Sequence, residues 1–326
     1  MFENMVNMEV NMRLCLNTDG LSHLPFEEMV KTAKQIGIES LEIACGNWSN
    51  APHINLDEMI SNEAARIKFM DTIRRNGLIL EALNCSGNQL EPNETGKAHQ
   101  TVVEKTFLLA EQLGVNHIVM MSGLPGGNAT DTTANWVTTC WPLSCQEMLR
   151  YQWEDVLIPY WEKTVKQAEN HGITSIALEN HGAQCVYNAE TLLKLRKAVG
   201  PMVGMNLDPS HHMWMGGDGI EMAKALGSDA IYHVHAKDLR KERERFAANG
   251  GLETKLFDDY RHRYWNYVAL GFGESLEWWK EFFATLCMMG YDGPVSLEIE
   301  DKTMPALTAI KKSIDFLHQT MPRDFV

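Results

Sequence analysis

The stretch TSIALENHG (residues 174–182) carries the pattern that decides the fold. It begins as an apolar run typical of a buried strand and ends in three polar residues, Glu179, Asn180 and His181. An ionised carboxylate at the end of a buried strand is costly unless another group compensates its charge. Two features of the chain then matter: how many similar strands it contains, and which groups can lie beside Glu179.

Seven further β-rich runs recur along the chain. They are MRLCLNTD (12–19), SLEIACG (40–46), ILEALNCSG (79–87), HIVMMSG (117–123), VGMNLDP (203–209), IYHVHAKD (231–238) and VSLEIE (295–300). Amphipathic helical patterns separate them, as in PFEEMVKTAKQIG (25–37). Strict alternation of strand and helix implies a parallel sheet, and eight such units predict an α/β protein, a single (β/α)8 TIM barrel domain over residues 1–326.

Length, charge and cysteine content narrow the class of protein. The 326 residues fit one barrel with insertions, and the net charge of −14 argues against a nucleic-acid surface, which would be basic. No apolar run is long enough for a transmembrane helix, and MFENMVNMEVNMR (1–13) is unlike a signal peptide. The seven cysteines lack CxxC spacing, so we expect reduced thiols in a cytoplasmic protein that binds neither nucleic acid nor membrane.

Alternation along the last four strands of the predicted barrel indicates which side chains face its interior. The predicted inward residues are Ala177, Glu179, His181, Asn206, Asp208, His233, His235, Lys237, Ser296, Glu298 and Glu300, whereas Tyr232 is predicted to face outward. Barrel enzymes carry their chemistry at the carboxyl ends of the strands. Acids and imidazoles from four neighbouring strands are therefore expected to meet in one region.

One inward ligand from each of these strands forms a candidate metal site, made up of Glu179, Asp208, His235 and Glu298. Each carboxylate alone could equally be an ion-pair partner, but three of them without a cation would repel one another and take up protons. One divalent cation relieves this repulsion. Oxygen ligands with a single imidazole suit Mn²⁺, our first expectation, as well as Mg²⁺, Co²⁺ or Zn²⁺, and the lack of a thiolate argues against a structural zinc.

Other polar residues are expected either to line the pocket or to have an ordinary structural role. His211, three residues after Asp208, is expected to face the pocket as a proton shuttle or substrate ligand. His233 lies deeper than His235 and is expected to be a hydrogen-bonded core residue, while Glu42 points inward by alternation alone and receives no role. The expected substrate contacts are His181, Lys237, Arg240, Trp48 and Trp136.

Four stretches, ALENHG (177–182), NLDPSH (206–211), YHVHAKD (232–238) and GYDGPVSLEIED (290–301), resemble the xylose-isomerase-like TIM barrels. That family includes sugar epimerases and inosose isomerases. The resemblance implies that the four candidate ligands bind one divalent metal, and that Glu179 and Glu298 flank the substrate carbon and move its proton, with His211 beside it. The arginine usual after the histidine of strand seven matches loosely, since Arg240 and Lys241 are both candidates; Arg240 also fits a solvent-exposed helix start.

Two long loops depart from a minimal barrel. Residues 124–146 follow strand four and residues 239–273 follow strand seven, so both lie on the active face. They carry Trp136, Trp141, Tyr260, Tyr264, Trp265, Tyr267 and Phe272, which fits a lid, a protein interface or a platform for a flat ligand group. The pattern NWVTTCWP…QWEDVLIPYW is similar to C-glycoside deglycosidases, two-subunit enzymes whose large, metal-binding subunit cleaves 3-oxo-glycosides of plant polyphenols. This resemblance implies a small second subunit and an oligomer.

The expected reaction begins with removal of a proton next to a sugar carbonyl that the metal polarises. Elimination of an aromatic aglycone would make the protein a lyase, the favoured reading because a polyphenol would use the aromatic loops. Reprotonation of a free keto-sugar or inosose would instead make it an epimerase or isomerase. Weaker alternatives are a sugar-binding barrel without turnover and a three-zinc abasic-site endonuclease, which the acidic chain disfavours.

Overall fold

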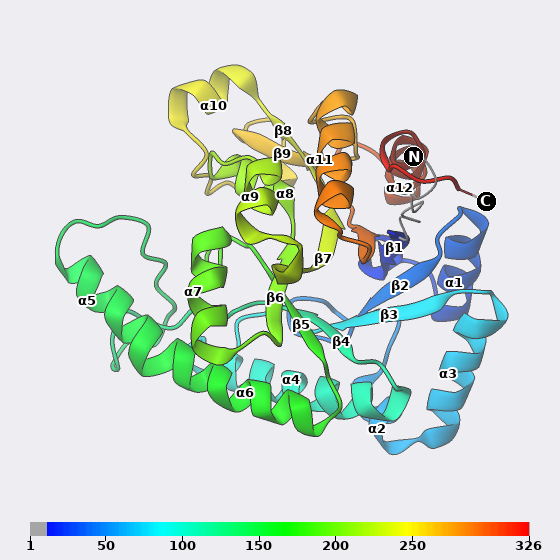
Figure 1. Cartoon of the computed structure of the whole chain (residues 1–326), viewed down its shortest axis with the longest axis horizontal. Helices are drawn as coiled ribbons and strands as arrows, with labels where there is room; N and C mark the ends of the chain where they lie inside the picture. Colours follow the sequence, from blue (N-terminus) through cyan, green and yellow to red (C-terminus); the bar gives the residue numbers. More distant parts are fainter. Residues whose placement is uncertain (1–11, 326) are drawn as a thin grey trace, which may run out of the picture.

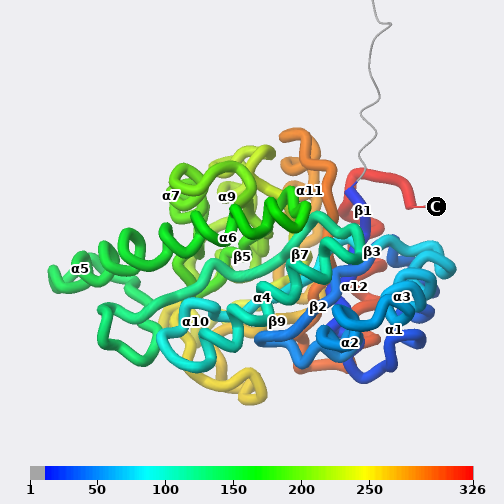
Figure 2. The backbone as a smooth tube through the Cα atoms, turned by 90° about the horizontal axis from the view of Figure 1, so that it is seen from below, coloured from blue at the N-terminus to red at the C-terminus, as the bar shows by residue number. Residues whose placement is uncertain are grey.

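The computed structural model describes residues 12–325 and contains a closed barrel of parallel strands. The order around the barrel is β1-β10-β7-β6-β5-β4-β3-β2, and helices surround it (Figures 1 and 2). The barrel strands are β1 (Arg13–Asn17), β2 (Ser40–Ala44), β3 (Ile79–Asn84), β4 (His117–Met120), β5 (Ser175–Glu179), β6 (Val203–Leu207), β7 (Ile231–Ala236) and β10 (Pro294–Leu297). The predicted TIM barrel is confirmed.

The connections contain helices and one additional strand pair. The α-helices are α1 (Phe26–Gln35), α2 (Leu56–Ser61), α3 (Glu63–Arg75), α4 (Glu94–Leu113), α5 (Ser144–Arg150), α6 (Ile158–Asn170), α7 (Ala189–Val199), α8 (Pro209–Trp214), α9 (Gly219–Leu226), α10 (Arg243–Asn249), α11 (Leu276–Met289) and α12 (Ala306–Thr320). The additional strands, β8 (Asp238–Lys241) and β9 (Trp265–Val268), pair antiparallel outside the barrel. Single 3₁₀ turns are η1 (Thr18–Leu21), η3 (Ser228–Ala230) and η4 (Phe257–Asp259).

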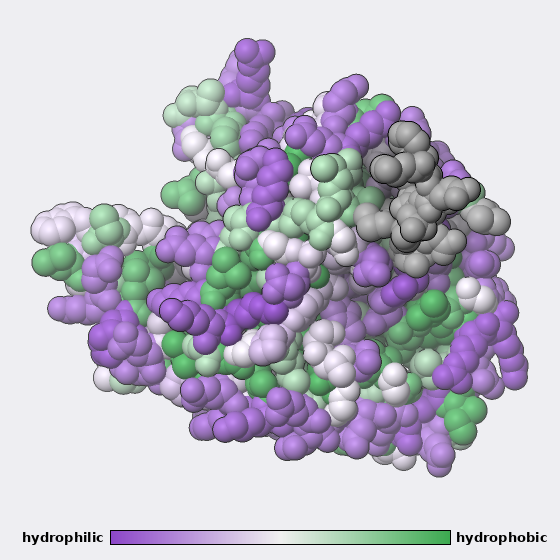
Figure 3. Space-filling model, in the orientation of Figure 1, coloured by the Kyte–Doolittle hydropathy of each residue, from purple (hydrophilic) through white to green (hydrophobic). Residues whose placement is uncertain are grey.

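The main hydrophobic core lies between the strands and the outer helices. Ile176 and Leu178 of β5 face this layer, whereas Ala177 between them packs inside the barrel with Ala82 and Val119. Hydrophilic residues predominate along the lower edge of Figure 3, where Figure 1 places α6. The helices are therefore amphipathic in the way that their sequences predict. No helix among residues 12–325 is long and apolar enough to cross a membrane.

Tyr232 is an exception to the predicted alternation. The register between β6 and β7 shifts by one residue, because Met205 pairs with Ile231 and the next residue, Asn206, pairs with His233. The extra residue on β7 is Tyr232, whose ring packs against the small residues inside the barrel instead of facing outward. Its hydroxyl lies 2.7 Å from Arg196 Nη1 and bonds to the carbonyl of Pro201. Because the bulge adds one residue to β7, His233 and His235 face inward even though Tyr232 also does.

The two long loops contain more regular structure than the sequence predicts. Helix α5 begins at Ser144, inside the expected loop 124–146, and continues through a π-helical segment, Tyr151–Leu157, into α6. Pro159, which has no N–H to donate, lies in the first turn of α6. The other loop is ordered by the β8–β9 pair and by α10, which lie together at one end of the molecule (Figure 1).

A glycine on β6 should be required by the ring of Tyr232. A Cβ placed on Gly204 would lie 2.3 Å from that ring, which Arg196 and Pro201 hold in place. We expect Gly204→Ala to lower the free energy of unfolding by about 1–3 kcal/mol. Urea denaturation measures this cost. The same substitution should cost clearly less in a Tyr232→Ala background, and equal costs in both backgrounds would contradict the clash.

Candidate metal centre and adjoining pocket

The four predicted metal ligands meet at the carboxyl end of the barrel. Glu179 ends β5, Asp208 follows β6, His235 lies on β7, and Glu298 follows β10. One ligand atom from each residue can be chosen so that all lie within 4.8 Å of one another. Glu179, Asp208 and His235 are buried, and Glu298 is half-buried at the mouth of the site. The strand parity read from the sequence therefore brings these side chains to one point.

The donor atoms at this point fit a divalent cation. Asp208 Oδ2 and His235 Nδ1 are buried without a well-formed hydrogen bond. Their nearest charged neighbours belong to the same site: Glu298 Oε2 lies 3.1 Å from Nδ1, and His211 Nε2 lies 3.4 Å from Oδ2. The other carboxylate oxygen of Asp208 accepts bonds from the backbone N–H and the hydroxyl of Ser210, at 2.8 and 2.6 Å, which fixes the direction of Oδ2. Two buried atoms without a hydrogen bond, together with carboxylate oxygens of Glu179 and Glu298, form the donor set that an ion such as Mn²⁺ or Zn²⁺ accepts.

The charges of the protein alone do not balance at this site. Burial raises the pKa of Glu179 well above its usual range and that of Asp208 to about 6. Burial acts the same way on Glu298, but Lys237 and His235 outweigh it and lower its pKa to about 2. The carboxylates Glu42, Glu298 and Glu179 raise the pKa of His235 against the effect of its burial. A proton on His235 thus supplies the positive charge that a bound cation would replace.

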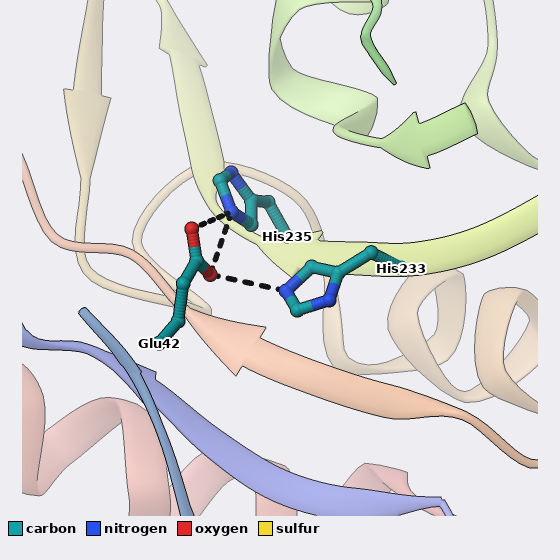
Figure 4. Close-up of side chains that lie close together, drawn as sticks. All are labelled: Glu42, His233 and His235. Atoms are coloured by element: carbon teal, nitrogen blue, oxygen red, sulfur yellow. Dashed lines mark hydrogen bonds and ion pairs between the residues drawn. The ribbon is translucent and has the colours of Figure 1, made fainter. Parts of the chain in front are cut away.

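Glu42 positions His235 from the side opposite the candidate metal centre. Its two carboxylate oxygens lie 3.2 and 3.1 Å from His235 Nε2, and one of them lies 3.0 Å from His233 Nε2 (Figure 4). Ser296 Oγ and Asn84 Nδ2 each donate to Glu42 at 2.6 Å. Because Glu42 is fully buried and both of its oxygens are occupied by protein donors, it holds the imidazole by a hydrogen bond in the manner of groups behind metal-bound histidines.

A column of hydrogen bonds continues from Glu42 through the barrel interior. His233 Nδ1 lies 3.1 Å from His117 Nε2, and His117 Nδ1 lies 2.7 Å from Ser175 Oγ. One consistent assignment has every group donate toward Glu42, from the hydroxyl of Ser175 through His117 and His233. His235 then donates through Nε2, and its Nδ1 presents a lone pair to the four-ligand site. The column thus favours the tautomer of His235 that can bind a metal.

Sequence reasoning placed His233 in the core but gave Glu42 no role. Alternation along β2 correctly predicted that Glu42 faces the barrel interior. Its contact with β7 across that interior could not be predicted, because no local sequence pattern encodes a contact between distant strands. Glu42, His233 and His235 could themselves surround an ion. The four-ligand site is the better candidate, because Glu42 has no free lone-pair direction beyond its protein donors.

His211 lies beside the carboxylates, as predicted, and Tyr267 holds it there. His211 Nε2 is 2.8 Å from Glu179 Oε1 and 3.4 Å from Asp208 Oδ2, and Tyr267 Oη lies 2.9 Å from His211 Nδ1. Burial lowers the pKa of His211 well below its usual value, so the ring is neutral. In the assignment in which Tyr267 donates to Nδ1, the proton of His211 lies on Nε2 and faces Glu179. Tyr267, expected only as a loop aromatic, is therefore part of the site.

Two cavities of different character meet at His181 and His211. The smaller cavity, about 160 Å³, contains Glu179, Glu298 and Lys237 and is lined largely by polar groups. The larger cavity, about 540 Å³, is lined almost entirely by apolar atoms from the segments after β4, β6 and β7. The rings of His181 and His211 stand 4.1 Å apart and line both cavities. One ligand with a polar and an apolar part could occupy both.

The predicted substrate contacts are divided between these cavities, with one exception. Lys237 Nζ lies 3.1 Å from both Glu298 Oε2 and Glu300 Oε1 in the polar cavity, where half-exposed Trp48 forms part of the wall. Trp136 lines the apolar cavity. Arg240 lines neither cavity: its Nε and Nη2 donate to Glu242 at 3.0 and 2.7 Å. Strand β8 directs Arg240 to this local partner on the hairpin, and its expected substrate role stays a prediction.

A closed barrel with this site geometry places the chain in a known class. The chain belongs to the xylose isomerase-like TIM barrel family, whose model matches residues 30–320. The protein named uncharacterized protein YfiH, from Bacillus subtilis (strain 168), is 53% identical over 312 residues, which are 95% of this chain and 99% of that protein.

Solved structures of the same fold are more distant in sequence. The IOLI protein with a bound zinc atom has a TM-score of 0.64 at 20% identity, over 95% of this chain and 100% of its own. A D-psicose 3-epimerase determined in the presence of D-fructose has a TM-score of 0.62 at 14% identity, over 95% and 99%. At these identities, the similarity establishes the shared fold.

The role of Glu42 can be tested by changing one atom. In Glu42→Gln, the amide nitrogen can donate to His235 Nε2, which would move the imidazole proton to Nδ1, where a metal needs the lone pair. We expect affinity for Mn²⁺ to fall about 10–100-fold, measured by calorimetry on protein first stripped with a chelator. The exposed Glu58→Gln substitution on α2 is the control and should leave affinity unchanged. Unaltered Mn²⁺ affinity in folded Glu42→Gln would contradict the role.

The buried His117 should make stability depend on pH. Burial, with a smaller effect of His233, lowers the pKa of His117 to about 3 in the folded protein, against about 6.5 in the unfolded chain. Its contribution is complete above pH 6.5 and is lost as the pH falls, by up to about 1.4 kcal/mol per pH unit. Urea denaturation of metal-free protein should show a smaller acid loss in His117→Gln. If the free energies of unfolding of the wild type and of His117→Gln fell in parallel with pH, His117 would not be a group that stays neutral in the folded protein.

Proposed function

We propose that the protein is a divalent-metal-dependent lyase that cleaves 3-oxo-glycosides by elimination of an aromatic aglycone. The observation that carries this proposal is that two unlike cavities share His181 and His211 as lining residues. The sugar ring would occupy the polar cavity beside Glu179 and Glu298, and the aglycone would lie in the apolar cavity beyond His181 and His211. The volume of the apolar cavity, about 540 Å³, is within the range of small-molecule sites.

The proposed metal ligands are Glu179, Asp208, His235 and Glu298. When bound, a divalent cation would polarise the sugar carbonyl and favour negative charge on its oxygen. Lys237 adds a fixed positive charge on the same wall, because its ammonium is buried between Glu298 and Glu300. The site therefore favours a substrate whose carbonyl oxygen gains negative charge during the reaction.

The chain offers acids and bases on both sides of the polar cavity. Glu179 and Glu298 approach from β5 and β10, and Nε2 of neutral His211 lies 2.8 Å from Glu179. In the proposed reaction, a carboxylate removes the proton from the carbon next to the carbonyl. The electron pair of that C–H bond forms a carbon–carbon double bond as the bond from the neighbouring carbon to the aglycone breaks. The aglycone takes up a proton as it leaves, and His211, on the wall shared by the cavities, is placed to supply it.

A sugar epimerase or isomerase is the second candidate. The same proton removal, followed by return of a proton to either carbon, needs only the polar cavity, and the D-psicose 3-epimerase has the same fold. The apolar cavity would then have no ligand, although five aromatic residues line it. A sugar-binding barrel without turnover would not need His211 beside Glu179. The second subunit and the oligomer implied by the sequence resemblance stay predictions.

Product analysis separates these functions. Purified protein with Mn²⁺ is incubated with 3-oxo forms of aromatic C- and O-glycosides and with free ketoses, while released phenol and exchange of the C2 proton with solvent are followed. We expect phenol release from the 3-oxo-glycosides. Conversion of ketoses alone would favour the epimerase, and binding of sugar and metal without any turnover would favour the non-catalytic barrel.

The two glutamates should be essential for turnover but not for folding. Glu179→Gln and Glu298→Gln remove a metal ligand and a base, and we expect turnover to fall by at least about 10²–10⁴-fold. The circular dichroism spectrum should be unchanged, because hydrophobic packing outside the barrel is untouched. The exposed Glu58→Gln variant provides the matched control. Wild-type turnover in either glutamate variant, or in the wild type after complete metal removal, would refute the proposed mechanism.

A further inference from the structure

A buried arginine lines the apolar cavity. Arg263, just before β9, is 3% exposed, and its guanidinium lies between two aromatic rings, 4.5 Å from the centre of Phe257 and 4.6 Å from that of Trp265. This cation therefore faces a chamber whose other lining atoms are nearly all apolar. A charge buried in such surroundings is costly unless a ligand or a counter-ion compensates it.

The protein supplies hydrogen bonds to Arg263 but no direct ion pair, although the nearby acids Glu253 and Asp259 partly offset the effect of burial on its pKa. Its Nε donates to the carbonyl of Trp265 at 3.2 Å, and its Nη1 donates to the carbonyl of Lys255. Within residues 12–325 no carboxylate forms an ion pair with it. The acid on the same cavity wall, Glu253, has a buried side chain that already accepts from Lys255 Nζ at 3.1 Å and from the N–H of Tyr264 at 2.6 Å. Among the residues that the structure describes, Nη2 of Arg263 makes no hydrogen bond.

The shape of the cavity favours a flat ring. Trp265 and Trp214 are stacked with 5.4 Å between their centres and 7° between their planes, and Trp136 meets Trp214 edge-on at 6.2 Å. Phe257 is stacked on Tyr267 at 5.7 Å, on the side toward His211. Aromatic walls of this kind bind planar groups by offset stacking. A planar guanidinium among them suits an anionic oxygen attached to such a ring.

We propose that Arg263 is a specificity-determining residue that binds an acidic hydroxyl on an aromatic ligand group in the apolar cavity. This inference deepens the proposed function and rests on it for identifying that group as the leaving aglycone. The aromatic walls select a flat ring, and Arg263 selects rings that carry a phenolic oxygen able to ionise. Substrates whose aglycones lack such a hydroxyl are expected to bind less tightly, although the chemistry in the polar cavity is the same for both.

Direct binding tests the subsite without turnover. The probe is 7-hydroxycoumarin, a flat fluorescent phenol, and 7-methoxycoumarin is its matched analogue without an ionisable oxygen. Both are titrated into full-length, metal-free protein at a pH above the pKa of the phenol. We expect the wild type to bind the phenol at least about tenfold more tightly than the methyl ether. Arg263→Met should remove this preference, whereas Arg261→Met, at an exposed position in the same loop, should retain it.

Two outcomes would overturn the inference. Equal affinity of the wild type for both probes would do so without any variant. An undiminished phenol preference in Arg263→Met would do so as well. Since Arg263 also bonds to two backbone carbonyls, Arg263→Lys is measured in parallel: it keeps the positive charge and should retain part of the preference even if the loop shifts. Phenol binding without turnover of 3-oxo-glycosides would leave the subsite intact and refute the lyase, so the two failures are distinguishable.

Discussion

The hydrogen bond between Glu42 and His235 is the interaction on which the candidate metal centre depends. It reaches across the barrel from β2 to β7 and occupies one nitrogen of the imidazole, so that the other can face three carboxylates. Carboxylates held this close need positive charge between them. Without a metal, His235 and Lys237 supply that positive charge, and a bound cation would replace the proton on His235. The rest of the site is arranged around this constraint.

The fold and the four ligands could be predicted from the sequence because both follow from periodicity. Strand–helix alternation fixed the barrel, and parity within strands placed Glu179, Asp208, His235 and Glu298 on its inner side. Tyr232 broke the parity rule, because a bulge depends on pairing with a neighbouring strand and not on the residue itself. Contacts across the barrel, such as that of Glu42, have no local pattern either.

The residues of the apolar cavity were the hardest to predict. The aromatic content of the loops was visible, but Tyr267 and Arg263 reach the site only because β9 pairs with β8 outside the barrel. Arg240, a neighbour of Lys237 in sequence, points to Glu242 for the same reason. Antiparallel pairing in a long loop is set by interactions between distant residues. A charged residue near a strand end can therefore point either into the site or toward a partner on the hairpin.

The β8–β9 hairpin pairs with itself and with none of the barrel strands. It begins directly after Lys237, and the carboxylate of Asp238 accepts N–H groups of Gly271, Gly273 and Glu274 where the chain returns. The hairpin is thus a module closed at its own base. Evolution could exchange or remodel it without disturbing the strands that carry the acids and the imidazole. Within the described part of the chain, only Tyr267 of β9, which bonds to His211, ties the hairpin to the acids and the imidazole. A grafted hairpin that keeps this tyrosine therefore offers a route to new ligand selectivity by design.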